Sequence, residues 1–302
     1  MCSPARTFKR AELLMGTSFE ITVCDSDGDA AEQATAAAFA EIRRIERLLS
    51  IFVDDSDISR LNRDKQIRDC STDLLENVRK SLYYSHLSSG AFDITVLPVL
   101  DLYAASFGST HLPPSIALVD QTRKRIDYRS IILGNEGVSI GAEQKITLGG
   151  IAKGYAVERA VSVLRQNRIH HALVNAGGNM RALGNKSFAK CWMVALQNPR
   201  IKDDYLARIR LNDNAVSTSG DYETYFNDDR TFHHIINPRT GTSATELISV
   251  TVITDNAWDA DALSTTLFVV GKDAARSLAA ELGIQTLMVA RDGSTTNVNW
   301  TL

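Results

Sequence analysis

Residues 146–155 read ITLGGIAKGY, a short apolar run followed by two adjacent glycines and the start of a helix pattern. Glycine lets a backbone approach a ligand closely, and the free N–H groups at a helix N-terminus favour anions such as a diphosphate. Lys153 adds a movable positive charge at the same place. The stretch lacks the glycine spacing and the Lys-Ser/Thr pair of a P-loop, and it is not a GxGxxG motif. A tight strand-to-helix turn and a phosphate-binding turn are therefore both open interpretations.

Helix and strand patterns extend outward from this stretch in both directions. Apolar residues at helical spacing, including Val157, Val161 and Leu164, predict a helix directly after it. Strands are predicted at Thr17–Cys24, Ser130–Leu133, Lys145–Leu148, His171–Asn175, Trp192–Gln197, Ala207–Leu211, Leu247–Thr254 and Thr286–Ala290. Further helices are predicted at Asp29–Leu49, through Ile58 and Leu61, from Ser71 or Thr72 to His86, at Ala260–Val270 and at Ala274–Leu282.

The order of these elements predicts the fold class. Strands and helices mix without a regular βαβ rhythm, which indicates an α+β fold with a mainly antiparallel sheet and packed helices. A chain of 302 residues can bury a large core, and we expect one large domain with two lobes over residues 8–300. Residues 102–128 have the weakest pattern, and we expect them to connect the lobes.

Composition excludes several classes of protein. The 33 basic and 36 acidic residues give a net charge of −3 without any Lys/Arg-rich run, which argues against a dedicated nucleic-acid binder. The four cysteines are far apart, so neither a structural zinc site nor a disulfide framework is indicated. We expect no transmembrane segment, because no apolar run approaches the roughly 20 residues that a bilayer requires.

The N-terminus predicts where the protein resides. It has no apolar core of a signal peptide, so we expect a cytoplasmic protein from the sequence as it is written. If an export signal had been removed before Cys2, this residue would stand where a lipid-anchoring cysteine stands. The protein would then be exported or lipid-anchored.

Asp261 and Thr265 form one candidate metal site. They are four residues apart in a predicted helix and therefore share a face. A carboxylate and a hydroxyl suit a hard cation and leave room for water and substrate phosphate. The alternative is structural: an acidic residue favours the first turn of a helix, and Thr265 simply packs.

Three other motifs carry polar groups with two interpretations each. His233 and His234 precede a Pro-Arg-Thr-Gly turn, and because adjacent strand residues alternate faces, one of them at most can serve as a base. Asp93 and Thr95 can orient a base or a ribose, or they can cap a turn. The glycine turn at 175–179 favours a structural role over a ligand contact.

Together and in this order, these motifs resemble the ApbE family, the FAD:protein FMN transferases. The resemblance runs from Met15 to Thr266 and is carried by these segments: Met15-Gly-Thr17, SDISRLN from Ser56, GAFDITV from Gly90, LGGIAKGYAV from Leu148, NAGG from Asn175, STSGDY from Ser217, HIINPRTG from His234 and ADALSTT from Ala260.

The resemblance implies an activity, two small molecules and a partner. Such enzymes take FAD as substrate with Mg²⁺, break its diphosphate, join FMN to a threonine or serine hydroxyl of a target flavoprotein, and release AMP. The implied metal ligands are the Gly150 carbonyl and the side chains of Asp261 and Thr265. His234 matches the histidine that helps the acceptor hydroxyl to lose its proton. The implied flavin contacts are Met15, Phe52, Ala91, Phe92, Asp93, Thr147, Lys153 and Ile235.

Four positions depart from the usual pattern of the family. Thr147, Asn179 and Asn237 each stand where an aspartate is common, and Glu158 replaces another aspartate. Thr147 removes a charge beside the implied nucleotide site. Two alternatives to transfer therefore stay open: an FAD-binding protein without turnover, and a metal-dependent FAD pyrophosphatase in which water replaces the acceptor hydroxyl.

Overall fold

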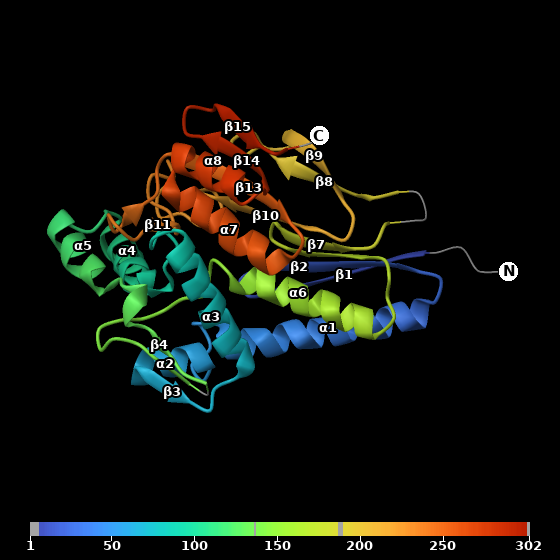
Figure 1. Cartoon of the computed structure of the whole chain (residues 1–302), viewed down its shortest axis with the longest axis horizontal. Coiled ribbons are helices and arrows are strands. Elements are labelled where there is room, and N and C mark those ends of the chain that lie inside the picture. The colour runs from blue at the N-terminus through green and yellow to red at the C-terminus, as the bar shows by residue number, and fades with distance from the viewer. Residues whose placement is uncertain (1–5, 136, 187–189, 301–302) are drawn as a thin grey trace.

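The computed structural model describes residues 6–135, 137–186 and 190–300, and an eight-stranded sheet lies at its centre (Figure 1). All neighbouring strands in this sheet are antiparallel. Their order is β1-β2-β6-β7-β10-β13-β14-β15. The strands are β1 (Arg6–Leu14), β2 (Thr17–Asp25), β6 (Ala172–Ala176), β7 (Asn179–Leu183), β10 (Ala215–Gly220), β13 (Leu247–Thr254), β14 (Gln285–Ala290) and β15 (Thr295–Val298).

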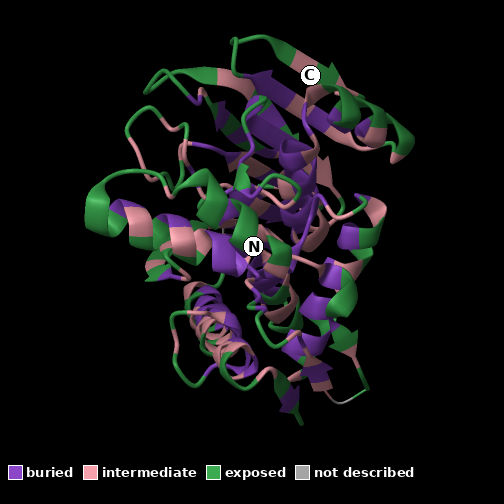
Figure 2. Ribbon diagram, turned by 90° about the vertical axis from the view of Figure 1, so that its left-hand side faces the viewer, coloured by how far each residue is buried: buried purple, intermediate pink, exposed green. Residues whose placement is uncertain are grey.

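Both faces of the sheet are covered. Side chains alternate between the two faces along each strand, and both faces carry apolar side chains that pack against other elements. Three helices lie on one face: α1 (Gly28–Leu49), α6 (Ala152–Gln166) and α7 (Ala257–Val270). A hairpin of β8 (Trp192–Gln197) and β9 (Tyr205–Leu211) packs on the other. Within β10, Ala215 belongs to the core beneath the helices and Val216 to the core beneath the hairpin. Figure 2 shows this buried interior between the exposed outer elements.

Smaller elements surround this central assembly. The remaining helices are α2 (Asp57–Asp64), α3 (Thr72–Leu87), α4 (Leu97–Thr110), α5 (Ile116–Thr122) and α8 (Lys272–Glu281), with 3₁₀ turns η1 (Ile94–Val96), η2 (Arg123–Arg125) and η3 (Tyr128–Ser130). The remaining strands are β3 (Gln66–Arg68), β4 (Ile132–Leu133), β5 (Gly137–Ser139), β11 (Ile236–Asn237) and β12 (Thr242–Ser243). Among the described residues, no helix has the length and apolar character needed to cross a bilayer.

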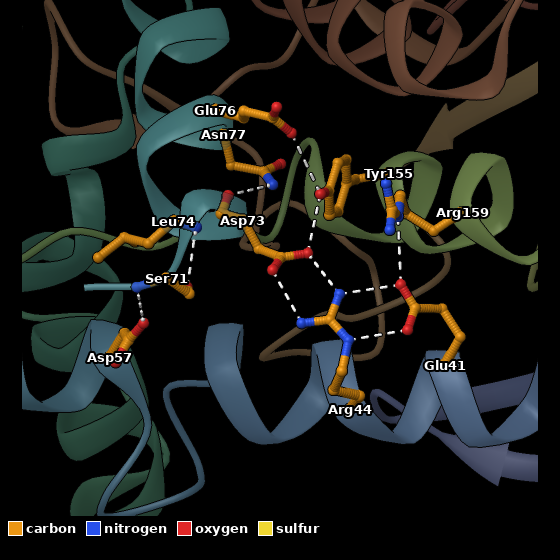
Figure 3. A network of polar contacts seen from close by, with 10 residues as sticks. All are labelled: Glu41, Arg44, Asp57, Ser71, Asp73, Leu74, Glu76, Asn77, Tyr155 and Arg159. Atoms are coloured by element: carbon orange, nitrogen blue, oxygen red, sulfur yellow. Dashed lines mark hydrogen bonds and ion pairs between the residues drawn. The ribbon is translucent and has the colours of Figure 1, made fainter. Parts of the chain in front are cut away.

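A polar network joins the three helices α1, α3 and α6 (Figure 3). Arg44 of α1 donates to Asp73 of α3 at 2.7 and 2.8 Å and also contacts Glu41. The Tyr155 hydroxyl of α6 donates to the same Asp73 carboxylate at 2.8 Å, and Arg159 donates to Glu41 at 3.1 Å. A planar guanidinium binds two carboxylates with directional bonds, so the network fixes α6 relative to α1 and α3.

The predicted α+β class with a mainly antiparallel sheet is confirmed. One predicted strand, Lys145–Leu148, is wrong, since in the described part of the chain this segment pairs with no strand. The segment is held instead by the Asn62 side chain, which accepts from Ile146 N at 2.7 Å and donates to Ile146 O at 2.9 Å. Of the strand predicted at Ser130–Leu133, only the last two residues are a strand, because Asp127 caps a 3₁₀ turn before it.

Residues 102–128, which we expect to connect two lobes, are largely helical. They contain the end of α4, α5 and η2. Tyr103 and Phe107 of α4 pack against Phe226 and Phe232 with ring centroids 5.4 to 5.9 Å apart. This separate aromatic cluster was not visible as a pattern because its members come from distant parts of the chain.

Candidate active site

The candidate active site is a pocket, here called the main pocket, bordered by the end of β10, the N-terminus of α6 and one face of α7. It brings together most of the residues that the sequence singles out. The predicted residues that line it are Ala91, Phe92, Asp93, Thr147, Gly150, Lys153, His234, Ile235, Asp261 and Thr265.

Met15 and Phe52 lie outside the main pocket, in a neighbouring hollow, here called the side pocket. Gly149 and Lys153 border both pockets, so the two are adjacent. Phe52 is 90% exposed, which leaves its ring free to stack on a planar ligand. The sequence therefore predicted residues of two adjoining pockets.

Two glycines allow α6 to approach α7 closely. A Cβ at Gly150 would lie 3.2 Å from the Thr265 hydroxyl oxygen and 3.3 Å from the Phe92 ring. A Cβ at Gly154 would overlap the Ala257 carbonyl and lie 2.6 Å from the Asp261 Cβ. Gly150 and Gly154 therefore lie directly against the face of α7 that carries Asp261 and Thr265, as a shared metal site requires.

The Asp261 carboxylate changes the hydrogen bonding at the start of α6. In a regular helix, the Gly154 N–H would bond to the Gly150 carbonyl four residues earlier. Here it donates to Asp261 Oδ2 at 2.8 Å. Among the described residues, no backbone N–H donates to the Gly150 carbonyl. This carbonyl is therefore available as a ligand beside Thr265.

These three groups fit a divalent cation such as Mg²⁺. Asp261 is only 4% exposed, and burial raises the pKa of its carboxyl, while the nearby Lys153 charge lowers that pKa. A bound cation would offset the cost of burying this negative charge. No group of three or more His, Cys, Asp or Glu residues clusters in the described part of the chain. The candidate set is one carboxylate, one hydroxyl and one carbonyl, all oxygen donors as Mg²⁺ prefers.

A chain of side-chain hydroxyls orients the Thr265 hydroxyl. Ser219 Oγ lies 3.2 Å from Thr265 Oγ1 and 2.8 Å from Ser264 Oγ, and Ser264 Oγ donates to the Asp261 carbonyl at 3.0 Å. A carbonyl only accepts, so with the Ser264 hydrogen on this carbonyl, Ser219 donates to Ser264 and Thr265 donates to Ser219. In this arrangement Ser219 binds the hydrogen of Thr265, and the lone pairs of Thr265 Oγ1 remain available to a cation.

His234 faces the main pocket with an unprotonated nitrogen. Its Nδ1 lies 2.8 Å from the Thr224 carbonyl, which only accepts, so Nδ1 carries the hydrogen and Nε2 has the free lone pair. Burial, followed by the nearby Lys153 charge, lowers the pKa of His234 to about 4. The imidazole is therefore neutral near pH 7 and can accept a proton at Nε2.

His233 is part of the buried core. It is fully buried, its Nε2 lies 2.9 Å from the Ala244 carbonyl, and its Nδ1 accepts from Ile235 N at 3.3 Å. Both ring nitrogens thus have partners. This arrangement agrees with the expectation that one of the two adjacent histidines at most faces the ligand.

Lys153 supplies positive charge at the N-terminus of α6. Its ammonium group forms no hydrogen bond or ion pair with the other described residues, and its charge lowers the pKa values of Asp261, His234 and Glu223. Glu223 also lines the main pocket, and although the residue is exposed overall, partial desolvation of its carboxyl raises its pKa. Sequence reasoning missed Glu223, although it directly follows the STSGDY motif.

Asp93 caps a turn rather than reaching freely into the pocket. Its Oδ1 accepts from the backbone N–H and hydroxyl of Thr95 at 2.8 and 2.7 Å, and its Oδ2 accepts from Tyr128 N at 3.0 Å. Burial raises the pKa of its carboxyl despite these bonds. Of the two interpretations from sequence, the structure shows turn capping.

The four departures from the family pattern each have a structural role. Thr147 Oγ1 accepts from Gly149 N at 3.2 Å, Asn237 Oδ1 accepts from Arg239 N at 3.0 Å, and Asn179 Oδ1 accepts from the Ser217 hydroxyl. Glu158 accepts from Ala257 N at 2.9 Å and so caps the start of α7. The neutral replacements at Thr147 and Asn237 therefore cap local backbone turns, and Asn179 links the start of β7 to β10.

Cys2, the residue on which a lipid anchor would depend, lies outside the described residues. The other three cysteines, Cys24, Cys70 and Cys191, are free.

Comparisons with known proteins agree with this geometry. The model of the ApbE family matches residues 15–288. The chain is 30% identical over 292 residues to a FAD:protein FMN transferase of Klebsiella pneumoniae, covering 92% of this chain and 83% of that protein. It is 32% identical over 312 residues to one of Treponema pallidum, covering 95% of this chain and 85% of that protein.

Solved structures give the same result for the fold. An ApbE protein of Thermotoga maritima superimposes with a TM-score of 0.88 at 30% identity, covering 97% of both chains. The flavinyl transferase ApbE of Pseudomonas stutzeri, in its apo form, gives 0.87 at 26% identity, covering 99% of this chain and 98% of that chain. The family match extends over most of the chain and over every element that borders the main pocket. The chain therefore belongs to the ApbE family.

Proposed function

We propose that this chain transfers FMN from FAD to a threonine or serine hydroxyl of a target flavoprotein, with Mg²⁺ bound and AMP released. The chain is a transferase, as its curated relatives are. One observation supports the finer proposal most strongly. A free Gly150 carbonyl, a buried Asp261 carboxylate and an oriented Thr265 hydroxyl line the same pocket as the neutral His234.

The residues of the chain divide the reaction between them. Gly150, Asp261 and Thr265 would hold Mg²⁺, which when bound neutralises charge on the diphosphate of FAD. Lys153 adds a second positive charge at the N-terminus of α6, where N–H groups also favour anions.

His234 handles the proton of the acceptor. As the hydroxyl oxygen of the acceptor bonds to the phosphorus on the FMN side, the bond from that phosphorus to the bridging oxygen breaks. AMP leaves with the bridging oxygen and its electron pair, while His234 Nε2 takes the hydroxyl proton. Atoms and charge balance without an additional reactant.

A labelling experiment tests this proposal. The purified protein would be incubated with FAD, Mg²⁺ and an extract from cells that lack its gene. We expect a polypeptide that stays fluorescent on a denaturing gel, with one AMP released for each flavin bound and FMN on a threonine or serine by mass spectrometry. Free FMN and AMP without labelling would instead identify a pyrophosphatase, and unchanged FAD would identify a binding protein.

A further inference from the structure

A second groove adjoins the main pocket on the hairpin side of the sheet. This hairpin groove lies between β8 and the ends of β7 and β10, and its lining includes Val194–Gln197, Met180, Val216 and Tyr222. It shares Gly177, Thr218 and Glu223 with the main pocket. The side pocket joins the main pocket through different residues, Gly149 and Lys153.

The reaction proposed above needs two approaches to the main pocket, one for FAD and one for a polypeptide hydroxyl. The side pocket suits the dinucleotide, because the exposed Phe52 ring and the Lys153 charge border it. The hairpin groove offers no exposed aromatic ring of that kind, since the Tyr222 ring packs over Gly220. Through Gly177, Thr218 and Glu223 it provides a second approach to the pocket that His234 lines.

The backbone on both sides of the hairpin groove suits an extended peptide. Four successive residues of β8 line the groove, so the edge of this strand borders it and not one face alone. In the described part of the chain, β8 pairs only with β9. On the other side, β10 pairs with β7 only at Ala215 and Val216, which leaves Ser217–Gly220 without a partner strand on that edge. Free strand edges bind extended peptides through backbone hydrogen bonds.

The groove is also held in a fixed shape. Arg200, just after β8, donates to both carboxylate oxygens of the fully buried Asp221 at 2.8 and 2.6 Å. Arg230 donates to the Pro199 carbonyl at 3.2 Å. These bonds tie the end of β8 to the segment that carries Tyr222 and Glu223, so binding would require little rearrangement.

We propose that the acceptor segment of the target flavoprotein lies extended in the hairpin groove, along the free edge of β8, and so delivers its hydroxyl to His234. This inference rests on the proposed transfer reaction. It assigns the groove to a polypeptide and the side pocket to the dinucleotide.

Paired substitutions on β8 test the assignment. Ala195 is exposed and lines the groove, whereas Met193 is exposed on the same face of β8 and does not line it. The probe is the purified polypeptide that becomes labelled in the transfer experiment. We expect Ala195→Trp to raise KM for this polypeptide at least tenfold. The Kd for FAD with Mg²⁺ and the melting temperature should stay unchanged, and Met193→Trp should behave like the unmodified protein.

Photo-crosslinking gives an independent readout. A benzoylphenylalanine at position 195 should cross-link to a peptide that contains the flavinylated residue, and one at position 193 should not. Equal KM values for both tryptophan variants, or a weaker FAD affinity in Ala195→Trp, would overturn the groove assignment while leaving transfer intact. Failure of the unmodified protein to label any polypeptide would instead refute the proposed function.

Discussion

At the scale of single residues, the site depends on groups whose protonation is set by their surroundings. The Thr224 carbonyl fixes the hydrogen of His234 on Nδ1, and burial keeps the ring neutral. Burial acts in the opposite direction on Asp261, where it favours the protonated carboxyl until a cation is bound. Burial therefore lowers the pKa of His234 and raises that of Asp261, and separate experiments can test the two effects.

Asp261→Asn should abolish cation binding without destabilising the fold. Because burial raises the pKa of this carboxyl in the folded protein, its charge destabilises the metal-free fold near pH 7, and the amide should be at least as stable. Mg²⁺ at a hundred times its Kd should stabilise the unmodified protein by about 2.7 kcal/mol and the variant not at all. Thermal unfolding in EDTA and in Mg²⁺ measures both effects. Equal stabilisation of the two proteins by Mg²⁺ would refute the metal assignment.

The pH dependence of transfer should report His234. With a pKa of about 4, the imidazole stays unprotonated as the pH falls from 7.5 to 5.5, so the single-turnover rate should not fall over this range. His234→Asn should lower that rate by roughly 10²- to 10⁴-fold with FAD binding unchanged. A rate that halves near pH 6.5 would show that the base is an ordinary, solvated histidine.

At the scale of elements, the contact between α6 and α7 brings the proposed metal ligands together. Gly154 has no side chain and so allows the two helices to pack closely. Its N–H donates to the Asp261 carboxylate and not to the Gly150 carbonyl. Sequence periodicity placed both helices but could not show that they touch. The wrong strand at Lys145–Leu148 has the same cause, since its partner is the side chain of Asn62 and not another strand.

Gly154→Ala should disrupt this contact. The added methyl group would overlap the Ala257 carbonyl and crowd Asp261, so we expect a loss of about 1–3 kcal/mol in the free energy of unfolding and weaker Mg²⁺ binding. Gly108→Ala in α4 is the matched control, because nothing lies within 4 Å of its added Cβ and alanine favours a helix. Urea unfolding and Mg²⁺ titration measure the outcome, and equal stabilities for the two variants would contradict the packing argument.

At the scale of the whole molecule, one antiparallel sheet lies between a layer of helices and the β8–β9 hairpin. Helices that carry the proposed metal ligand Asp261 and the charge of Lys153 cover one face, and the β8–β9 hairpin covers the other (Figure 1). The main pocket joins both sides at the end of β10. The fold as a whole also carries two histidines with lowered pKa values, His233 and His234, and these link its stability to pH.

Acidification should therefore weaken the fold. The stabilising contribution of each histidine is complete above its unfolded pKa near 6.5 and is lost as the pH falls toward the folded value. For His234, with a folded pKa of about 4, we expect a loss of about 1–2 kcal/mol between pH 7.5 and pH 5. Urea unfolding at both pH values should show a smaller drop in His234→Gln, and an unchanged drop in the exposed control His170→Gln. An equal drop in all three proteins would refute this linkage.

The sequence by itself determined the fold class, most helices, the family and the candidate residues of the site, because local periodicity and short motifs record these directly. Only the tertiary structure decided which groups are chemically free. The Gly154–Asp261 bond joins residues 107 positions apart, and the hydroxyl chain and the hairpin groove likewise combine distant segments. Such contacts leave no local pattern, because each depends on how closely separate elements pack.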